Sequence, residues 1–264
     1  MRNLAFRDMR LPRLGAMRSG GFFPASLFAG GSIGDAFIPE REFTYTKSGG
    51  GVYERVTTTG DEVARLTGMV NGINLDQDTF AKRPIYTEGS GLAWLAFDGV
   101  GDFMAVADVS GMRQSIMTFF IGVDPLSLFA SREDWFASGN SSSYASNNYI
   151  FGNSSSAFQT FGRTPASKVF QGSMTANTKV IVSARSDGTN INSRINGVAQ
   201  TTAALTLGTN DTSGFTLGSS KSGVGSMNHA KMNMYGLIVR GSTSSAAEIA
   251  STEAYMAAKT GVVL

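Results

Sequence analysis

The chain has 264 residues, enough for one large domain that buries its own core. Charged residues make up only 16% and glycines number 32, a composition typical of a turn-rich β protein rather than a helical enzyme. Cysteine is absent, which excludes disulfides, thiolate metal sites and a cysteine nucleophile. The single histidine, His229, excludes any site that needs two imidazoles.

Positive charge is concentrated in the first twenty residues. Five arginines and one acid, Asp8, give this arm a net charge of +4, so the rest of the chain carries −2 of the overall +2. The arginines interrupt every apolar run, so we expect no signal peptide and no membrane span. We predict that the arm binds an acidic groove on a partner protein; nucleic acid, an acidic membrane surface and a merely disordered terminus are the alternatives. The anchoring candidates are Arg2, Arg7, Arg10, Arg13 and Arg18.

The segment Phe22–Pro39 shows neither a helical nor a strand period, so we expect an irregular segment packed on the rest. With the arm it forms a predicted anchoring region, 1–39, ahead of a β-sandwich domain over 40–264. Glycine-containing turns then separate short predicted strands at Phe43–Tyr45, Val52–Val56 and Glu62–Leu66.

The most strand-like part of the chain begins at Leu92. Two apolar runs flank the turn Asp98–Asp102, which predicts a hairpin over Leu92–Val106. The nearly continuous apolar run Ser115–Val123, closed by Pro125, predicts a central strand covered on both faces.

Aromatic residues alternate with small polar ones over Trp135–Arg163, which predicts half-exposed antiparallel strands. Further strands are predicted at Lys179–Ala184, Asn190–Ile195, Phe215–Gly218 and Met232–Val239. The end of the chain is different, because Ser245 and Glu248 form a capping box, an alanine-rich stretch follows, and Gly261 stands at the C-cap. This predicts one helix of about thirteen or fourteen residues that packs on the sandwich.

Three local patterns, in this order, resemble the laminin-G-like or concanavalin-A-like lectin family: Leu95–Phe103, then Val180–Gly188 with Arg194–Gly197, then Phe215–Ser219 with Met234–Val239 and the helix that ends in Ala258–Val262. The resemblance implies an all-β fold, an antiparallel jelly-roll sandwich, with its lectin-like core at about 92–262. The tract from Ser26–Gly31 to Lys82–Pro84 resembles the leader of this domain in structural proteins of tailed bacteriophages and prophages.

The candidate sugar-binding residues lie in the aromatic and asparagine-rich tract, because aromatic rings stack on sugars and amides bind hydroxyl groups. They are Tyr144, Asn147, Asn148, Tyr149 and Asn153. The same alternation also arises in any sheet with one buried face, so both interpretations stay open. No metal site and no cofactor is predicted, since Asp98, Asp102 and Asp187 stand in turns, where aspartate commonly bonds its own backbone.

A glycoside hydrolase needs two carboxylates facing each other, and no strand-like run offers such a pair. We therefore predict a non-enzymatic structural component of a phage or phage-like virion: a capsid decoration, head spike or fibre, or tail protein. Its predicted location is the virion, and its predicted partners are capsid or tail proteins, further copies of itself and host glycans. The net charge of −2 disfavours nucleic-acid binding by the globular part. The alternatives are a free-standing adhesin or lectin and, less favoured, a hydrolase on the same fold.

Overall fold

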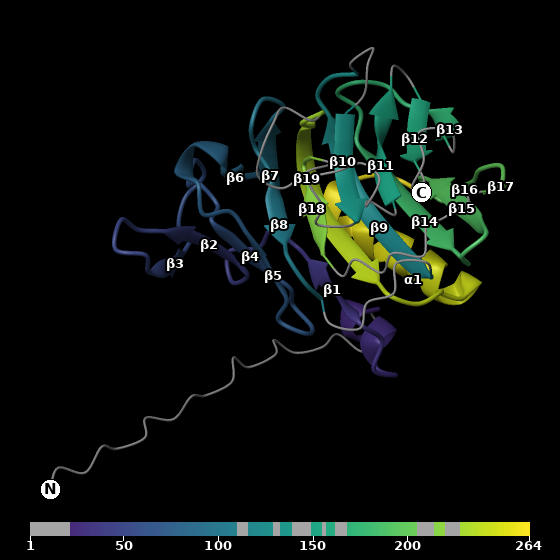
Figure 1. The fold of residues 1–264 in the computed structure, drawn as a ribbon, viewed down its shortest axis with the longest axis horizontal. Coiled ribbons are helices and arrows are strands. Elements are labelled where there is room, and N and C mark those ends of the chain that lie inside the picture. The colour runs from purple at the N-terminus through teal and green to yellow at the C-terminus, as the bar shows by residue number, and fades with distance from the viewer. Residues whose placement is uncertain are drawn as a thin grey trace, which may run out of the picture.

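The computed structural model describes residues 22–109, 116–128, 133–138, 149–154, 157–161, 168–204, 214–219 and 228–264. Within these ranges, two antiparallel sheets pack face to face, and one α-helix lies on the outer face of one of them (Figure 1). The predicted antiparallel β-sandwich with a single C-terminal helix is confirmed. The arginine-rich arm, with Arg2, Arg7, Arg10, Arg13 and Arg18, lies outside the described residues.

Sheet A contains the longest strands and the central strand of the fold. In spatial order it consists of β16 (Val198–Ala199), β15 (Asn190–Ile195), β14 (Val180–Ser186), β9 (Met117–Pro125), β19 (Lys231–Arg240), β7 (Leu92–Asp98) and β6 (Ile85–Gly89), with β1 (Gly34–Phe37) on β19 and β17 (Ala203–Ala204) on β15.

Sheet B has ten strands and faces the inner side of sheet A. Its order is β13 (Lys168–Ser173), β12 (Ala157–Phe161), β11 (Tyr149–Ser154), β10 (Glu133–Ser138), β18 (Phe215–Leu217), β8 (Met104–Val106), β5 (Asn74–Asp76), β4 (Arg65–Thr67), β2 (Thr44–Lys47) and β3 (Tyr53–Arg55). Of two short 3-10 helices, η1 (Pro24–Phe28) precedes β1, and η2 (Phe80–Lys82) lies between β5 and β6.

Aromatic rings from both sheets fill the core. Phe119 of β9 stacks on Phe136 of β10 with ring centroids 5.9 Å apart, and Phe136 in turn contacts Phe215 of β18 at 5.4 Å. β9 is buried along nearly its whole length between β14 and β19, which confirms the predicted central strand. Such interlocking aromatic contacts bury large apolar areas and hold the two sheets at a fixed spacing.

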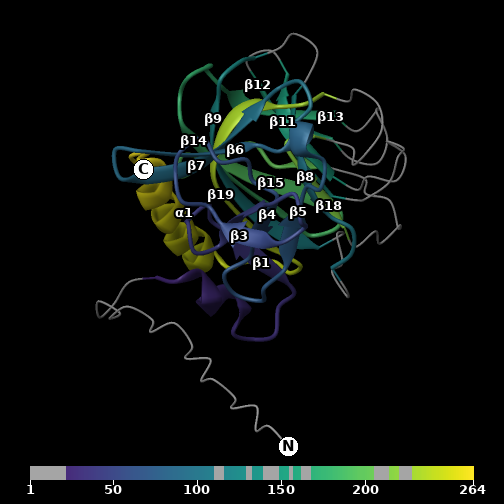
Figure 2. The ribbon, with the colours of Figure 1, turned by 90° about the vertical axis from the view of Figure 1, so that its left-hand side faces the viewer.

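The helix α1 (Ala246–Thr260) begins at the predicted capping box, where Ser245 accepts the amide of Glu248, and ends at Gly261 with a φ of 77°. It lies against the outer face of sheet A (Figure 2), where Met256 packs with Phe120, Ile181 and Ile238. Glycines of β9 and β19 allow this close approach. A Cβ atom at Gly122 would stand 2.4 Å from the Cγ2 of Thr260, and one at Gly236 would stand 3.1 Å from the Cε of Met256.

The prediction of an irregular segment over Phe22–Pro39 is wrong for its second half. Gly34–Phe37 forms β1, which pairs with the far end of β19 and is completely buried. Asp35 holds this strand in place, because its carboxylate accepts the backbone amides of Ala36, Val70, Asn71 and Ile73. A four-residue strand whose partner lies about two hundred residues away leaves no periodic signal.

The predicted hairpin over Leu92–Val106 is also wrong. β7 lies in sheet A and β8 in sheet B, so the turn between them carries the chain from one sheet to the other. Asp98 accepts the amides of Val100, Gly101 and Asp102, and Asp102 accepts the amide of Asp98. The Asp-Gly signal identified a sharp turn correctly, but not which strand the chain would join after it.

The strands predicted within Trp135–Arg163 exist as β10, β11 and β12 and pair antiparallel. β10, however, is buried along its entire length instead of half-exposed. A register shift between Asp134 and Phe136 explains part of this, because it allows the consecutive residues Trp135 and Phe136 both to enter the core.

Candidate functional site: a charged pocket at the C-terminal end of α1

A pocket of about 560 Å³ opens where the last turn of α1 meets the β6–β7 hairpin. This volume falls within the range of roughly 300–1,000 Å³ found for small-molecule sites. We call it the tyrosine pocket. It is lined by Ile38, Glu40, Arg41, Tyr86, Glu88, Gly89, Gly91, Leu92, Ala93, Tyr235, Ala258 and Lys259.

Local sequence places each wall of the tyrosine pocket. The segment 38–41 follows β1 directly and forms one wall, and the last turn of α1 forms another. The third wall is the hairpin between β6 and β7, whose two-residue turn has positive φ at both Ser90 (53°) and Gly91 (76°). Both angles are those of the tight turns that join hairpin strands with the natural right-handed twist, so this wall is rigid.

Glu88 is the centre of the polar network in the tyrosine pocket. Arg41 donates two hydrogen bonds to its carboxylate, Nε to Oε1 at 2.9 Å and Nη2 to Oε2 at 2.5 Å. The hydroxyl of Tyr86 donates to the same Oε1. These donors, Arg41 first, hold the pKa of Glu88 below its usual value. Burial raises the pKa of Tyr86, and its bond to Glu88 adds to that rise, so its hydroxyl stays a proton donor.

A second ion pair closes the opposite side of the pocket, where Lys259 of α1 donates to Glu40. The two glutamates, Glu40 and Glu88, therefore line one cavity, and their side chains are 37% and 34% exposed. Each carboxylate has a cationic partner, so the pocket is neutral overall but rich in both donors and acceptors. A ligand with many hydroxyl groups can bond to both kinds of group.

Tyr235 of β19 lies at the floor of the pocket and is almost fully buried. The ring of Trp94 packs against it at 5.6 Å, and the Nζ of Lys179 lies 4.8 Å from its ring centroid. Burial, with a contribution from the charge of Asp124, raises the pKa of Tyr235 to about 12. The floor is therefore aromatic and uncharged across the ordinary pH range.

Two other acidic groups are chemically unusual but lie outside the pocket. Burial, together with the nearby charge of Asp98, raises the pKa of Asp102 to about 7. Burial also raises the pKa of Glu133, which accepts the hydroxyl of Ser127 at 2.5 Å. In the part of the chain that the structure describes, no three His, Cys, Asp or Glu side chains are placed to hold a metal ion. No described helix is both long and apolar enough to cross a membrane.

The structure reaches only part of the predicted sugar-binding tract. Tyr144, Asn147 and Asn148 lie outside the described residues, and Tyr149 begins β11. Asn153 is fully buried and is paired with Glu133 of the neighbouring strand β10, and the polar atoms of its side chain meet the hydrogen-bond criteria with none of the described residues. Asn153 therefore does not lie on the surface where a glycan contact was predicted.

Sequence reasoning missed the tyrosine pocket completely. Its residues come from four separate parts of the chain. Tyr235, Ala258 and Lys259 stand in the patterns that resemble the lectin family, but those patterns do not mark them as site residues. Two signals could have helped. Four charged residues, Glu40, Arg41, Glu88 and Lys259, stand out in a chain with only 16% charge, and Ser90–Gly91 marks the tight hairpin that forms one wall.

Comparison with known proteins shows the fold of this chain but not its family. No family model matches the sequence, and no curated protein does either. A GH54 α-L-arabinofuranosidase soaked with a cyclic sulfate inhibitor is similar in structure, with a TM-score of 0.64 and 11% identity over 90% of this chain and 66% of that one. Domain 4 of AbnA, a GH43 extracellular arabinanase from Geobacillus stearothermophilus, in complex with arabinotriose, gives 0.52 and 12% over 84% of this chain and 98% of that one.

The sialidase of Trypanosoma rangeli in complex with sialic acid is also similar, with a TM-score of 0.57 and 12% identity over 81% of this chain. This chain spans 36% of that sialidase, about a third of its length. At such identities the likeness shows a shared β-sandwich fold. Because these structures all come from glycoside hydrolases, the prediction of a non-enzymatic protein is contradicted and is withdrawn.

Proposed function

We propose that this protein is a carbohydrate-active β-sandwich that binds a short oligosaccharide in the tyrosine pocket. The observation that carries the proposal is the convergence of two carboxylates, a guanidinium, an ammonium and two tyrosines around one cavity of about 560 Å³. Sugar hydroxyls both donate and accept, so they suit a cavity with paired donors and acceptors better than a purely apolar ligand does.

The structural neighbours support a sugar as the ligand class. The AbnA domain, whose own length this chain covers almost completely, was determined with arabinotriose. The GH54 enzyme that this chain resembles is an α-L-arabinofuranosidase. Arabinotriose is therefore the first ligand to try, followed by a panel of neutral oligosaccharides.

The test is isothermal titration calorimetry with arabinotriose and the panel on the full chain and on Glu88→Gln. The substitution keeps the size of the side chain but removes the charge that orients Arg41. We expect at least tenfold weaker binding for Glu88→Gln, with an unchanged melting temperature. Glu54→Gln, at an exposed position on β3 outside the pocket, is the matched control and should bind like the wild type. Binding that Glu88→Gln leaves intact, or no binding by the wild type, contradicts the proposal.

A second function, hydrolysis of a glycosidic bond, is favoured by one specific observation. Glu40 and Glu88 line the same pocket with different partners, and glycosidases commonly use two carboxylates in different environments. Because Arg41 and Tyr86 lower its pKa, Glu88 would be the ionised base or nucleophile, with Glu40 as the second carboxyl.

Release of nitrophenol from p-nitrophenyl α-L-arabinofuranoside tests this second function. Turnover by the wild type that falls at least a hundredfold in both Glu88→Gln and Glu40→Gln supports it. Turnover that neither substitution changes, or no turnover at all, counts against hydrolysis but leaves the binding proposal open, because calorimetry detects binding without chemistry.

The role in a phage-like virion stays a prediction from the sequence. The same holds for the laminin-G-like resemblance, the virion location, the capsid or tail partners and the homo-oligomer. A glycan site on a β-sandwich agrees with a virion protein that contacts host sugars and equally with a free-standing lectin or hydrolase.

A further inference from the structure

A second concavity, of about 450 Å³, lies on the other side of α1. Its floor is the outer face of β14 and β15, with Arg185, Asn192 and Arg194, and its rim carries Gln200 and Thr202. The first turns of α1 form the remaining wall. We call it the arginine groove. Two guanidinium groups line it, and none of the described residues that line it is acidic.

Arg194 is held in the groove by a buried carboxylate. Its Nε donates to both carboxylate oxygens of Glu253, at 2.9 and 3.2 Å, and its Nη2 donates to the carbonyl oxygen of Gly197. Glu253 is only 3% exposed and also accepts the hydroxyl of Ser183 at 2.6 Å. These contacts fix the position of Arg194 and neutralise its charge.

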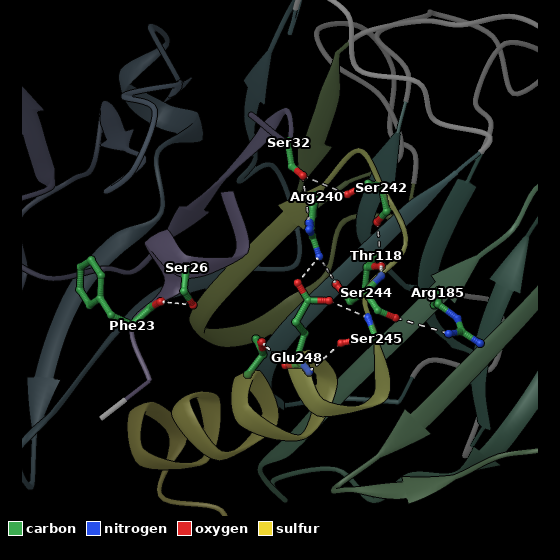
Figure 3. A network of polar contacts seen from close by, with 11 residues as sticks. Phe23, Ser26, Ser32, Thr118, Arg185, Arg240, Ser242, Ser244, Ser245 and Glu248 are labelled. Atoms are coloured by element: carbon green, nitrogen blue, oxygen red, sulfur yellow. Dashed lines mark hydrogen bonds and ion pairs between the residues drawn. The ribbon is translucent and has the colours of Figure 1, made fainter. Parts of the chain in front are cut away.

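Arg185 is in a different situation. Its contact with the described residues is a long one, 3.4 Å from Nη1 to the carbonyl oxygen of Ser244, and no described carboxylate forms an ion pair with it. Figure 3 shows it at the edge of the polar network that fixes the start of α1, joined by a single dashed line. The acid of that network, Glu248, is bonded to Arg240 at 2.9 Å and to the helix cap.

The framework beside Arg185 is rigid. The hydroxyl of Thr118 donates to the carbonyl of Ser242 and accepts the amide of Ser244, both at 2.9 Å, so the loop before α1 is fixed to β9 (Figure 3). On the other side, Asn192 accepts the hydroxyl of Thr202 at 2.6 Å through its Oδ1. This bond leaves the amide Nδ2 of Asn192 as a donor directed by a fixed side chain.

We propose that the arginine groove binds the carboxylate of an acidic saccharide, with Arg185 as its charge partner. A guanidinium presents two parallel N–H donors that match the two oxygens of a carboxylate. The amide of Asn192 and the hydroxyl of Thr202 lie in the same groove and bind the hydroxyl groups of the sugar ring. This site shares no lining residue with the tyrosine pocket and does not depend on the function proposed there.

Two acidic probes with neutral counterparts test the proposal by calorimetry on the full chain. They are trigalacturonate against its methyl ester, and sialyllactose against lactose, and they distinguish a uronic acid from a sialic acid. We expect at least one acidic probe to bind ten or more times more tightly than its neutral counterpart. In Arg185→Gln this preference should fall to within twofold, while Arg185→Lys should keep part of it.

Arg55→Gln, at an exposed position on β3 of sheet B, is the matched control, because it removes the same charge outside the groove. It should keep the preference, and so should Glu88→Gln, whose site is the tyrosine pocket. Melting temperatures show whether each variant is folded. The proposal is overturned if neither acidic probe is preferred, or if a folded Arg185→Gln keeps the wild-type preference.

Discussion

The two cavities beside α1 use similar side chains in opposite ways. In the tyrosine pocket every charge has a partner, Arg41 with Glu88 and Lys259 with Glu40. In the arginine groove Arg194 is paired, but Arg185 has no carboxylate partner among the described residues. The pocket is therefore suited to a neutral ligand with many hydroxyl groups, and the groove to one that carries a negative charge.

The helix itself produces this difference. At its C-terminal end Lys259 reaches into the tyrosine pocket and neutralises an acid there. At its N-terminal end the acid Glu248 is already bound to Arg240 and to the cap, so it forms no ion pair with Arg185. The outer face of sheet A thus has a neutral pocket near one end of α1 and a positively charged groove near the other, because the charged residues at the two helix ends differ.

The largest expected effect comes from Asp35→Ala, which should disrupt the tyrosine pocket but not the arginine groove. The fully buried carboxylate of Asp35 accepts four backbone amides and so fixes β1, which leads directly into the pocket wall 38–41. Leaving these amides unpaired should lower the free energy of unfolding by about 3 to 5 kcal/mol. Urea unfolding measures this change.

Ligand binding to folded Asp35→Ala gives the specific readout. Binding in the tyrosine pocket should be lost, and binding in the arginine groove should persist. Asp35→Asn, which keeps one acceptor oxygen, should be intermediate in stability. Equal loss at both sites would show that β1 does not support the pocket in particular.

Gly122→Ala should weaken both sites together. The new methyl group would stand 2.4 Å from Thr260, whose hydroxyl is bonded to the carbonyl of Met256 at 3.0 Å and whose side chain is buried. Displacing α1 should destabilise the fold by about 1 to 3 kcal/mol, measured by thermal unfolding. Gly50→Ala is the control, because nothing lies within 4 Å of the new atom there. Wild-type stability in Gly122→Ala would disprove the tight helix contact.

The smallest expected effect is a difference in salt dependence. Raising NaCl from about 0.05 to about 0.5 M screens exposed charges strongly. Binding of an acidic saccharide in the arginine groove should weaken several-fold, while binding of arabinotriose in the tyrosine pocket should change by less than twofold. Calorimetry at the two salt concentrations checks this, and equal sensitivity would remove the electrostatic distinction.

The sequence predicted those elements that are determined by residues close together in the chain. β9 was recognisable because a strand buried on both faces is a continuous apolar run, and the start of α1 was recognisable because a capping box needs particular residues, here Ser245 and Glu248. β1 was missed because it has only four residues and pairs with β19 at the far end of the chain. The turn at Asp98 was recognised, but a turn signal does not specify which sheet receives the next strand.

The candidate sites were not predictable for a related reason. Glu40 and Lys259 are 219 positions apart, and Arg185 is distinguished only by the lack of a carboxylate partner among the described residues. Asn153 looked like an exposed sugar contact because asparagine usually lies on the surface, yet it is buried and paired with the buried Glu133 of the adjacent strand β10. Only the pairing of distant strands reveals which polar side chains are brought together.

Hydrogen exchange measured by mass spectrometry on the full chain, with arabinotriose and with the preferred acidic saccharide in turn, can show whether two separate binding sites lie beside α1. Two separate sites predict that arabinotriose protects the hairpin around 86–93 and the end of α1, whereas the acidic saccharide protects the strands around 190–204. If both ligands protect the same segment, or if neither changes exchange beside α1, the account of two differently charged sites is contradicted.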